Sequence, residues 1–211
     1  MARIPYGILG EFTGNAGNVS GYMRMGANFI RSKRRKSTKP VTPARLAQQQ
    51  KIKICHEFTR CFTGSGFFDR TFPQKINTAT GYNKATSALM RKAITGVYPD
   101  ISLSWPDVQI SGGGMPSVPV AATTGGADSI LFTWDDNAGT GTARSSDIAV
   151  LVAYFPAVKQ AVFGISTQRR GDGMAELKTH GQTGEAHTWA GFISEDGKDA
   201  ADSVYAGILT I

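Results

Sequence analysis

Residues 129–134 read SILFTW, and residues 148–155 read IAVLVAYF. In the first segment the large side chains Ile130, Phe132 and Trp134 alternate with Leu131 and Thr133, which is the period of two of a β-strand. We expect the three large side chains to face inward, because exposing them would leave a sizeable apolar patch. The second segment is a longer extended run of the same kind. Both segments predict that this half of the chain is built from antiparallel strands.

The period of two extends from residue 101 to residue 211. Seven or eight short extended runs, separated by clusters of Gly, Asp and Asn, are typical of an antiparallel β-sandwich of immunoglobulin-like type. Trp134 and Tyr154 each close a run and are the expected core anchors, since aromatic side chains bury the most area. The expected strands are Val108–Ser111, Val118–Thr123, Ser129–Trp134, Ile148–Phe155, Ala161–Ser166, Met174–Lys178, His187–Ser194 and Ser203–Ile211.

Residues 32–100 predict a basic linker followed by a helical hairpin. Thr42 can cap a helix and Pro43 suits its first position, so we expect a helix from Pro43 to about Phe62, ended by Gly64-Ser65-Gly66. A second helix is expected over 73–95, with Gly81 weakening its middle. Its expected core residues are Ile76, Ala79, Ala85, Ala88, Leu89 and Ala93.

Residues 1–31 are punctuated by glycine and predict a small β-meander or extended β arm. The expected extended segments are Ile8–Thr13, Asn18–Arg24 and Ala27–Arg31, with turns at 14–17 and 25–26. Such a ribbon is marginal alone in water and must pack on something else. The predicted fold class is therefore α+β, with a glycine-rich arm (1–31), a basic linker and helical hairpin (32–100) and a sandwich (101–211).

Charge is unevenly divided along the chain. Of 23 Lys and Arg, 17 lie in residues 1–100 against 4 Asp and Glu, whereas residues 101–211 hold the other 6 against 12. The net charges are +13 and −6, which agree with the total of +7. This asymmetry fits nucleic acid bound to the basic part. It fits equally well a basic region of one subunit docked on the acidic region of the next.

The segment 31–53 is the candidate binding segment, because it holds nine cations and no acid. Phosphate backbones attract such runs through counterion release, although few aromatic residues lie nearby for base stacking. A solvated linker followed by a polar helix face is the alternative interpretation. The candidate contacts to nucleic acid or another polyanion are Arg31, Lys33, Arg34, Arg35, Lys36, Lys39, Arg45, Lys51 and Lys53.

Two resemblances rest on longer stretches of sequence. ILFTW at 130–134, IAVLVAY at 148–154 and WAGFISEDG at 189–197, followed by Ser203, resemble a fibronectin type III-like domain. The whole chain is similar to an uncharacterised bacterial family, known only as a domain of unknown function. That family implies no catalytic residues. Its matching stretches are MARI at 1–4, GILG at 7–10, Phe12, AITGVYPD at 93–100, TWDDN at 133–137 and FISEDGK at 192–198.

Other classes of protein are not favoured. No stretch has the roughly 20 apolar residues of a membrane span, and the opening residues lack the apolar core of a secretory signal. We therefore expect the chain in the cytoplasm or within an assembled particle. Cys55 and Cys61 make no disulfide framework. Asp135-Asp136-Asn137 with Asp147 lacks the residue order of a calcium loop, and no metal or cofactor is expected.

We expect a protein that is not an enzyme, because the chain has no phosphate-binding loop and no nucleophile motif. The predicted function is that of a structural, self-assembling homo-oligomer, such as a virion, prophage-particle or filament subunit, with contacts through the N-terminal arm. The alternative is an intracellular nucleic-acid-binding protein that uses residues 31–53. No small-molecule substrate is expected.

Overall fold

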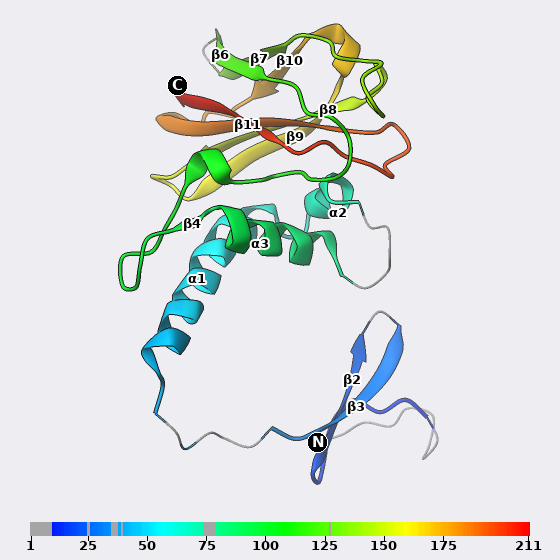
Figure 1. The fold of residues 1–211 in the computed structure, drawn as a ribbon, viewed down its shortest axis with the longest axis vertical. Coiled ribbons are helices and arrows are strands. Elements are labelled where there is room, and N and C mark those ends of the chain that lie inside the picture. Colours follow the sequence, from blue (N-terminus) through cyan, green and yellow to red (C-terminus); the bar gives the residue numbers. More distant parts are fainter. Residues whose placement is uncertain (1–9, 25, 35–37, 39, 74–78, 127) are drawn as a thin grey trace. The chain divides into compact units, whose positions relative to one another are not determined.

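The computed structural model divides the chain into two units, residues 1–41 and 42–211, each described here by itself (Figure 1). The residues that it describes are 10–24, 26–34, 38, 40–73, 79–126 and 128–211.

The first unit is a three-stranded antiparallel sheet in the order β1-β2-β3. Its strands are β1 (Gly14–Ala16), β2 (Val19–Arg24) and β3 (Ala27–Ser32). The second and third strands agree with the predicted segments. The predicted turn at 14–17 instead contains β1, because the chain reverses at Gly17 (φ 56°). Of the segment expected over 8–13, residues 8 and 9 lie outside the described residues.

The second unit begins with helices that follow the predicted start signal. Helix α1 (Pro43–Thr59) begins where expected, with the Thr42 hydroxyl accepting a hydrogen bond from the Arg45 amide at 3.4 Å. A 3-10 turn, η1 (Arg60–Phe62), continues it to the predicted end. Residues 43–53 contain no buried side chain, whereas Cys55 and Phe58 near the end of α1 are buried. The helix is therefore anchored by its C-terminal half.

The helix predicted over 73–95 is present but shorter, because it begins at Gly81 after the extended cap residue Thr80 and ends at Lys92. The structure has a short α2 (Phe67–Thr71) and a separate α3 (Gly81–Lys92), and Gly81 begins α3 instead of lying in its middle. A Cβ at Gly81 would lie 2.1 Å from the Phe68 carbonyl oxygen, so only glycine fits where the two helices meet. The Gly81 amide also donates to Asp69 Oδ1 at 2.8 Å. Of the expected core, Ile76 lies outside the described residues, and Ala85, Leu89 and Ala93 are buried.

Most of the predicted strands are present. Two antiparallel sheets have the orders β10-β7-β6 and β12-β11-β8-β9. The strands are β6 (Val120–Gly126), β7 (Ser129–Trp134), β8 (Ile148–Phe155), β9 (Gln160–Arg169), β10 (Met174–Lys178), β11 (Glu185–Ile193) and β12 (Val204–Thr210). Three minor elements precede them: β4 (Ile94–Thr95), β5 (Ser102–Leu103) and the 3-10 turn η2 (Trp105–Asp107).

The predicted strand 108–111 is not a strand, although Val108 and Ile110 are buried. Its amides find other partners, since the Ile110 amide donates to Ser203 Oγ at 2.9 Å. The alternation of apolar residues in this segment reflects burial without strand pairing.

The second unit has three layers, with the four-stranded sheet in the middle (Figure 1). Ile130, Phe132 and Trp134 point into the core between the two sheets and are at most 7% exposed, which confirms the predicted inward face. The other face of the four-stranded sheet packs on the helices, through residues such as Tyr154 and Trp189. Strand β8 is therefore buried on both faces, which explains its continuous apolar run. The fold is α+β, as predicted.

No helix among the described residues has the length and apolar character needed to cross a bilayer.

Candidate functional site

The two faces of the arm sheet, β1 to β3, differ in their surroundings. Side chains two apart on a strand share a face, as do cross-strand partners. Gly21 pairs with Ile30, and the neighbouring pair is Met23 with Asn28. We call the face that carries these side chains the Phe12 face; its members are Val19, Gly21, Met23, Asn28, Ile30 and Ser32.

Phe12 covers part of this face. A Cβ at Gly21 would lie 2.7 Å from the Phe12 ring, so glycine is required for the ring to pack against the strand. The side-chain amide of Asn28 donates to the Phe12 carbonyl at 2.9 Å. Gly21 is the buried residue of the described part of this unit.

The opposite face, which we call the aromatic face, consists of Ser20, Tyr22, Arg24, Ala27, Phe29 and Arg31. Tyr22 and Phe29 are direct cross-strand partners, and their rings stack with centroids 5.7 Å apart and planes at 22°. The Arg31 guanidinium lies over the Tyr22 ring, 5.1 Å from its centroid. Tyr22 is 37% exposed and Phe29 is 43% exposed. This face therefore presents two rings and cationic side chains to solvent.

The structure divides the predicted binding segment between the two units. Arg31, Lys33 and Arg34 follow one another at the end of β3, and the Lys33 amide extends the ladder by donating to the Asn18 carbonyl at 2.8 Å. The remaining described members lie on α1 and are Arg45, Lys51 and Lys53. Arg35, Lys36 and Lys39 lie outside the described residues.

Tyr22 was not predicted to lie beside the basic run. The sequence does contain a signal for this position. Residues 22 and 29 are equally far along the chain from the centre of the turn at 25–26, so they must pair if the hairpin is tight.

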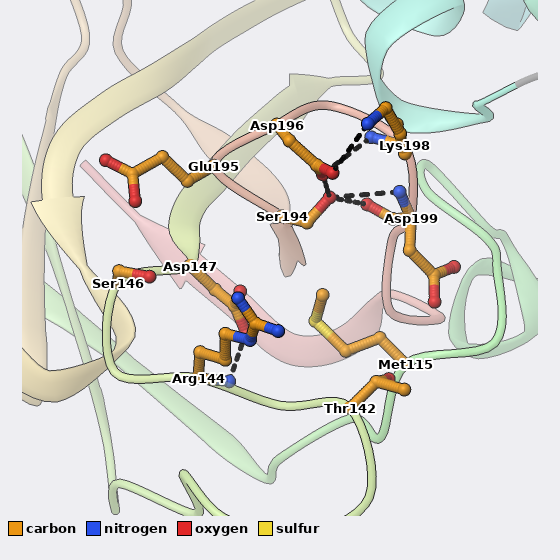
Figure 2. A pocket seen from close by; sticks show the side chains of 10 residues that line it. All are labelled: Met115, Thr142, Arg144, Ser146, Asp147, Ser194, Glu195, Asp196, Lys198 and Asp199. Carbon is orange, nitrogen blue, oxygen red and sulfur yellow. Dashed lines mark hydrogen bonds and ion pairs between the residues drawn. The ribbon is translucent and has the colours of Figure 1, made fainter.

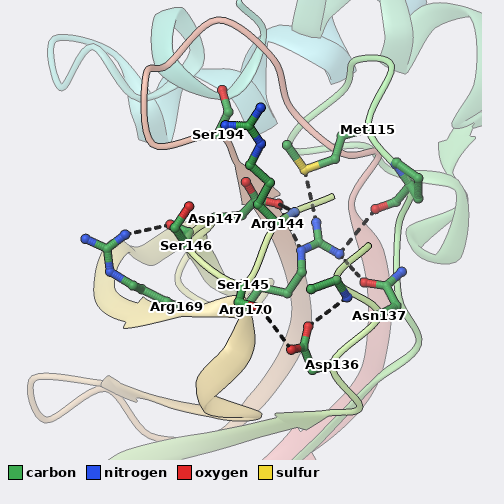
Figure 3. Close-up of polar contacts among 12 residues, drawn as sticks. Met115, Asp136, Asn137, Arg144, Ser145, Ser146, Asp147, Arg169, Arg170 and Ser194 are labelled. Atoms are coloured by element: carbon green, nitrogen blue, oxygen red, sulfur yellow. Dashed lines mark hydrogen bonds and ion pairs between the residues drawn. The ribbon is translucent and has the colours of Figure 1, made fainter. Parts of the chain in front are cut away.

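Arg170 organises a second polar cluster, inside the sandwich (Figure 3). Its side chain is fully buried, and Nε donates to Asp147 Oδ2 at 3.1 Å. The other guanidinium nitrogens donate to the Asn137 side chain, the Pro116 carbonyl and Met115 Sδ. The guanidinium carbon lies 4.1 Å from the centre of the Phe192 ring. Burial lowers the pKa of Arg170, while the charge of Asp147 opposes that shift.

This network accounts for the acidic sequence that resembles a calcium loop. Asn137 and Asp147 accept hydrogen bonds from Arg170, and Asp136 Oδ1 accepts one from the Ala138 amide at 2.9 Å. Among the described residues, no group of three or more His, Cys, Asp or Glu side chains is placed to hold a metal ion.

A polar cleft of about 370 Å³ lies beside the loop that contains residues 194–199 (Figure 2). Ser194 Oγ lies 2.7 Å from Asp196 Oδ1 and accepts a hydrogen bond from the Asp199 amide at 2.9 Å. The hydrogen bond from Ser194, together with that from the Lys198 amide, lowers the pKa of Asp196. The residues that line the cleft are Met115, Thr142, Arg144, Ser146, Asp147, Ser194, Glu195, Asp196, Lys198 and Asp199.

The hydroxyl of Ser194 has a structural role in this cleft, because it holds the loop together. None of the lining residues is a histidine or a cysteine, so they offer no serine–histidine or cysteine–histidine pair.

Comparison with protein families gives a match over residues 11–207, which spans both units. The chain belongs to DUF6266, a family of unknown function. Neither the comparison with curated proteins nor the comparison with solved structures found a match.

Two of the stretches that resemble an uncharacterised family meet at Arg170. From TWDDN, Trp134 donates its indole N–H to the Arg170 carbonyl at 2.7 Å, and Asn137 accepts from the guanidinium. From FISEDGK, Phe192 lies under the guanidinium. In this DUF6266 chain these stretches therefore build the interior of the sandwich and its adjoining loop.

The thiols and histidines lie apart from these clusters. Cys55 is buried, whereas Cys61 Sγ lies 3.2 Å from the Lys159 carbonyl; both are free. His56 Nδ1 lies 3.3 Å from the Tyr82 hydroxyl. His187 is buried, stacked on Trp105 at 4.5 Å and hydrogen-bonded through Nδ1 to the Tyr205 hydroxyl at 2.7 Å.

Proposed function

We propose that this protein is a non-enzymatic structural subunit that self-assembles into a virion, prophage particle or filament through its N-terminal arm. The observation that carries the proposal is the lack of an interior in the arm. Small sheets of this size need a packed face to be stable, yet the described arm buries only Gly21. Its large exposed apolar side chains are Val19, Tyr22, Met23, Phe29 and Ile30.

The outer edges of β1 and β3 are available to pair with another chain. In the sheet order each has a single neighbour, β2, so each leaves one row of backbone groups without a strand partner in this sheet. Such edges bind other chains by adding a strand to an existing sheet.

A suitable acceptor is present in the second unit, where the edge strands β6 and β12 of the two sheets lie next to one another. Neither strand contains a charged residue or a proline, the residues that usually prevent an exposed edge strand from pairing with another chain. Ile208 on β12 is 54% exposed. By contrast β10, at the other side of the sandwich, carries Glu176 and Lys178. We propose that the arm of a second copy docks along β6 and β12.

Charge favours the same pairing. Residues 1–41 hold 8 Lys and Arg against 1 Glu, so this unit carries the entire net charge of +7. The acidic residues Asp128 and Asp135 flank the β6–β7 hairpin at its two ends. A cationic arm is attracted to this surface on another subunit.

The sandwich also supports the proposed similarity to fibronectin type III-like domains. Of its seven strands the first, second and fifth form one sheet, and the third, fourth, sixth and seventh form the other. The sheets are antiparallel and pack face to face over one core. Domains of this architecture serve many functions, so the similarity supports the fold alone. The proposed function is argued from the features of the arm.

The test compares the oligomeric state of three proteins by light scattering and electron microscopy. The full chain should form a defined oligomer or particle, and the 42–211 fragment, which retains its own core, should be a folded monomer. Ala121→Lys on β6 should reduce assembly, whereas Met174→Lys on β10 is the matched control and should not. A monomeric full chain, or a fragment that assembles as the full chain does, would exclude the arm as connector.

A second candidate function is contact with nucleic acid or another polyanion, favoured by the concentration of the whole net charge in residues 1–41. Replacing Lys33, Arg34, Arg35 and Lys36 with serine should weaken binding and flatten its dependence on salt. Absence of measurable binding by the unmodified chain at low salt would remove this candidate.

A further inference from the structure

We propose that the aromatic face of the arm binds single-stranded nucleic acid, with bases stacked on Tyr22 and Phe29 and backbone phosphates held by Arg31, Lys33 and Arg34. This inference rests on the second candidate function and assigns it a surface and a class of ligand.

The first reason is that the arm carries two rings that stack on one another and are partly exposed. Tyr22 and Phe29 are nearly parallel, 22° apart, and both are more than one third exposed. Every base presents a flat π-face, so a pair of exposed rings binds single strands without regard to sequence. Bases in a duplex are already stacked and do not offer that face.

The second reason is that the two faces of the hairpin expose different kinds of side chain. The Phe12 face exposes the non-aromatic Val19, Met23 and Ile30, and the opposite face exposes the two rings. Phe12 packs on Gly21, and Asn28 donates to the Phe12 carbonyl, which closes part of the Phe12 face. Among the described residues of the unit, no such segment covers Tyr22 and Phe29. The two side chains are 37% and 43% exposed.

The third reason is that the charge around the rings is of a single sign. Between Glu11 and Glu57 the chain contains ten cations and no acid. Arg31 lies over the Tyr22 ring, and Lys33 and Arg34 leave the same end of β3. A stacking surface bordered by arginine and lysine matches the alternation of base and phosphate in a single strand.

A peptide is the competing ligand, since Tyr and Arg are also enriched at protein interfaces. Nucleic acid is favoured at this face because the acceptor strands proposed on a second copy have two acidic residues beside them, Asp128 and Asp135, whereas each nucleotide supplies its own negative charge.

The experiment measures binding of the full chain to a fluorescein-labelled oligo(dT) of 12 nucleotides by fluorescence anisotropy. Tyr22→Leu and Phe29→Leu should each raise the Kd by roughly 5- to 150-fold, the effect of removing one stacking ring. Arg31→Gln should reduce the slope of log K against log salt by about 0.7, the value for one phosphate contact on a single strand. Tyr22→Phe retains the ring and should restore binding.

Ile30→Ser is the matched control, because Ile30 is exposed, adjacent in sequence and on the Phe12 face. It should leave the Kd within about twofold of the unmodified protein. Circular dichroism of each variant checks that the arm retains its strands.

Three results would overturn the inference. If oligo(dT) binds but both leucine variants bind equally well, the contact is electrostatic and the aromatic face is wrong, while polyanion binding stands. If duplex DNA binds as tightly as oligo(dT), stacking plays no part. If no oligonucleotide binds and the leucine variants instead abolish assembly, the face is a protein interface and the polyanion function fails as well.

Discussion

Phe58 and Tyr154 in the second unit and Tyr22 and Phe29 in the arm form ring pairs of similar separation, 5.2 Å and 5.7 Å between centroids. The first pair is at most 5% exposed, and the second is 37% and 43% exposed. Ring contact alone contributes only about 0.5–1.5 kcal/mol beyond burial, so the buried pair stabilises its unit far more than the exposed pair does. The second unit is therefore held together from within, whereas the aromatic pair of the arm remains partly exposed.

The largest effect expected from this difference is on Trp134. Trp134→Ala should lower the free energy of unfolding of the full chain by about 3–5 kcal/mol, because it empties a buried aromatic site and removes the hydrogen bond to the Arg170 carbonyl. Tyr22→Ala is the matched change in the arm and should alter the same transition by less than about 0.5 kcal/mol. Urea unfolding followed by tryptophan fluorescence measures both. Equal effects of the two changes would contradict the contrast between the units.

A smaller effect is expected at Gly81. Gly81→Ala should destabilise the second unit by about 1–3 kcal/mol, since the added Cβ would press on the Phe68 carbonyl and force α2 and α3 apart. Ser87→Ala, in the exposed part of α3, is the control for helix propensity. Thermal unfolding compares the two variants. A Gly81→Ala protein as stable as the unmodified chain would mean that the helices adjust to the methyl group at little cost.

The smallest expected effect concerns pH and His187. Burial lowers the pKa of His187 below its ordinary value of 6.5, and the charge of Glu185, 4.0 Å away, opposes the shift. The unfolded chain therefore binds a proton more readily than the folded chain. Stability of the second unit should be fully present above about pH 6.5 and should fall as the pH drops toward the folded pKa. The arm contains no histidine and should show no such change.

His187→Gln should remove this dependence in urea titrations between pH 7 and pH 5. Asp128 and Asp196 do not interfere, because hydrogen bonds from Thr179 and Ser194 lower their pKa values below 3.8. An unchanged pH profile in His187→Gln would assign the dependence to other groups.

Local pattern predicted much of the sandwich. Strands β7, β8 and β10 have the bounds expected from their alternation and apolar runs, and Thr42-Pro43 marked the start of α1. These signals are local, because they depend on the period of the backbone and on residues a few positions apart.

The failures have a different origin. The segment 108–111 has the pattern of a strand, but the Ile110 amide bonds to the side chain of Ser203, 93 positions away, instead of to a neighbouring strand. A glycine at position 81 predicts a weak point within a helix, whereas its actual role depends on the close approach of Phe68, which exists only in the folded chain. The Arg170 network joins residues 33 and 54 positions apart and left no local signal.

The candidate site was predicted in part. The cations of 31–53 were identified from sequence, because a run without acids needs no structure to be recognised. The aromatic face was not identified, since it depends on the register that pairs Tyr22 with Phe29. The adjacency of β6 and β12, the proposed acceptor strands, was not predicted either, because adjacency of two sheet edges is a property of the folded sandwich.

The part of α1 that has no buried side chain, residues 43–53, has a mechanical consequence. A pull on the arm enters the second unit through residues 43–53, which bury no side chain, while Cys55 and Phe58 beyond them are fixed in the core. Under load these turns should unwind before the core yields. Their length would grow from about 1.5 Å to about 3.3 Å per residue, so 11 residues would add roughly 20 Å of tether. If the arm were bound to another subunit, unwinding of these turns would lengthen the link between the arm and the sandwich while the sandwich stays folded.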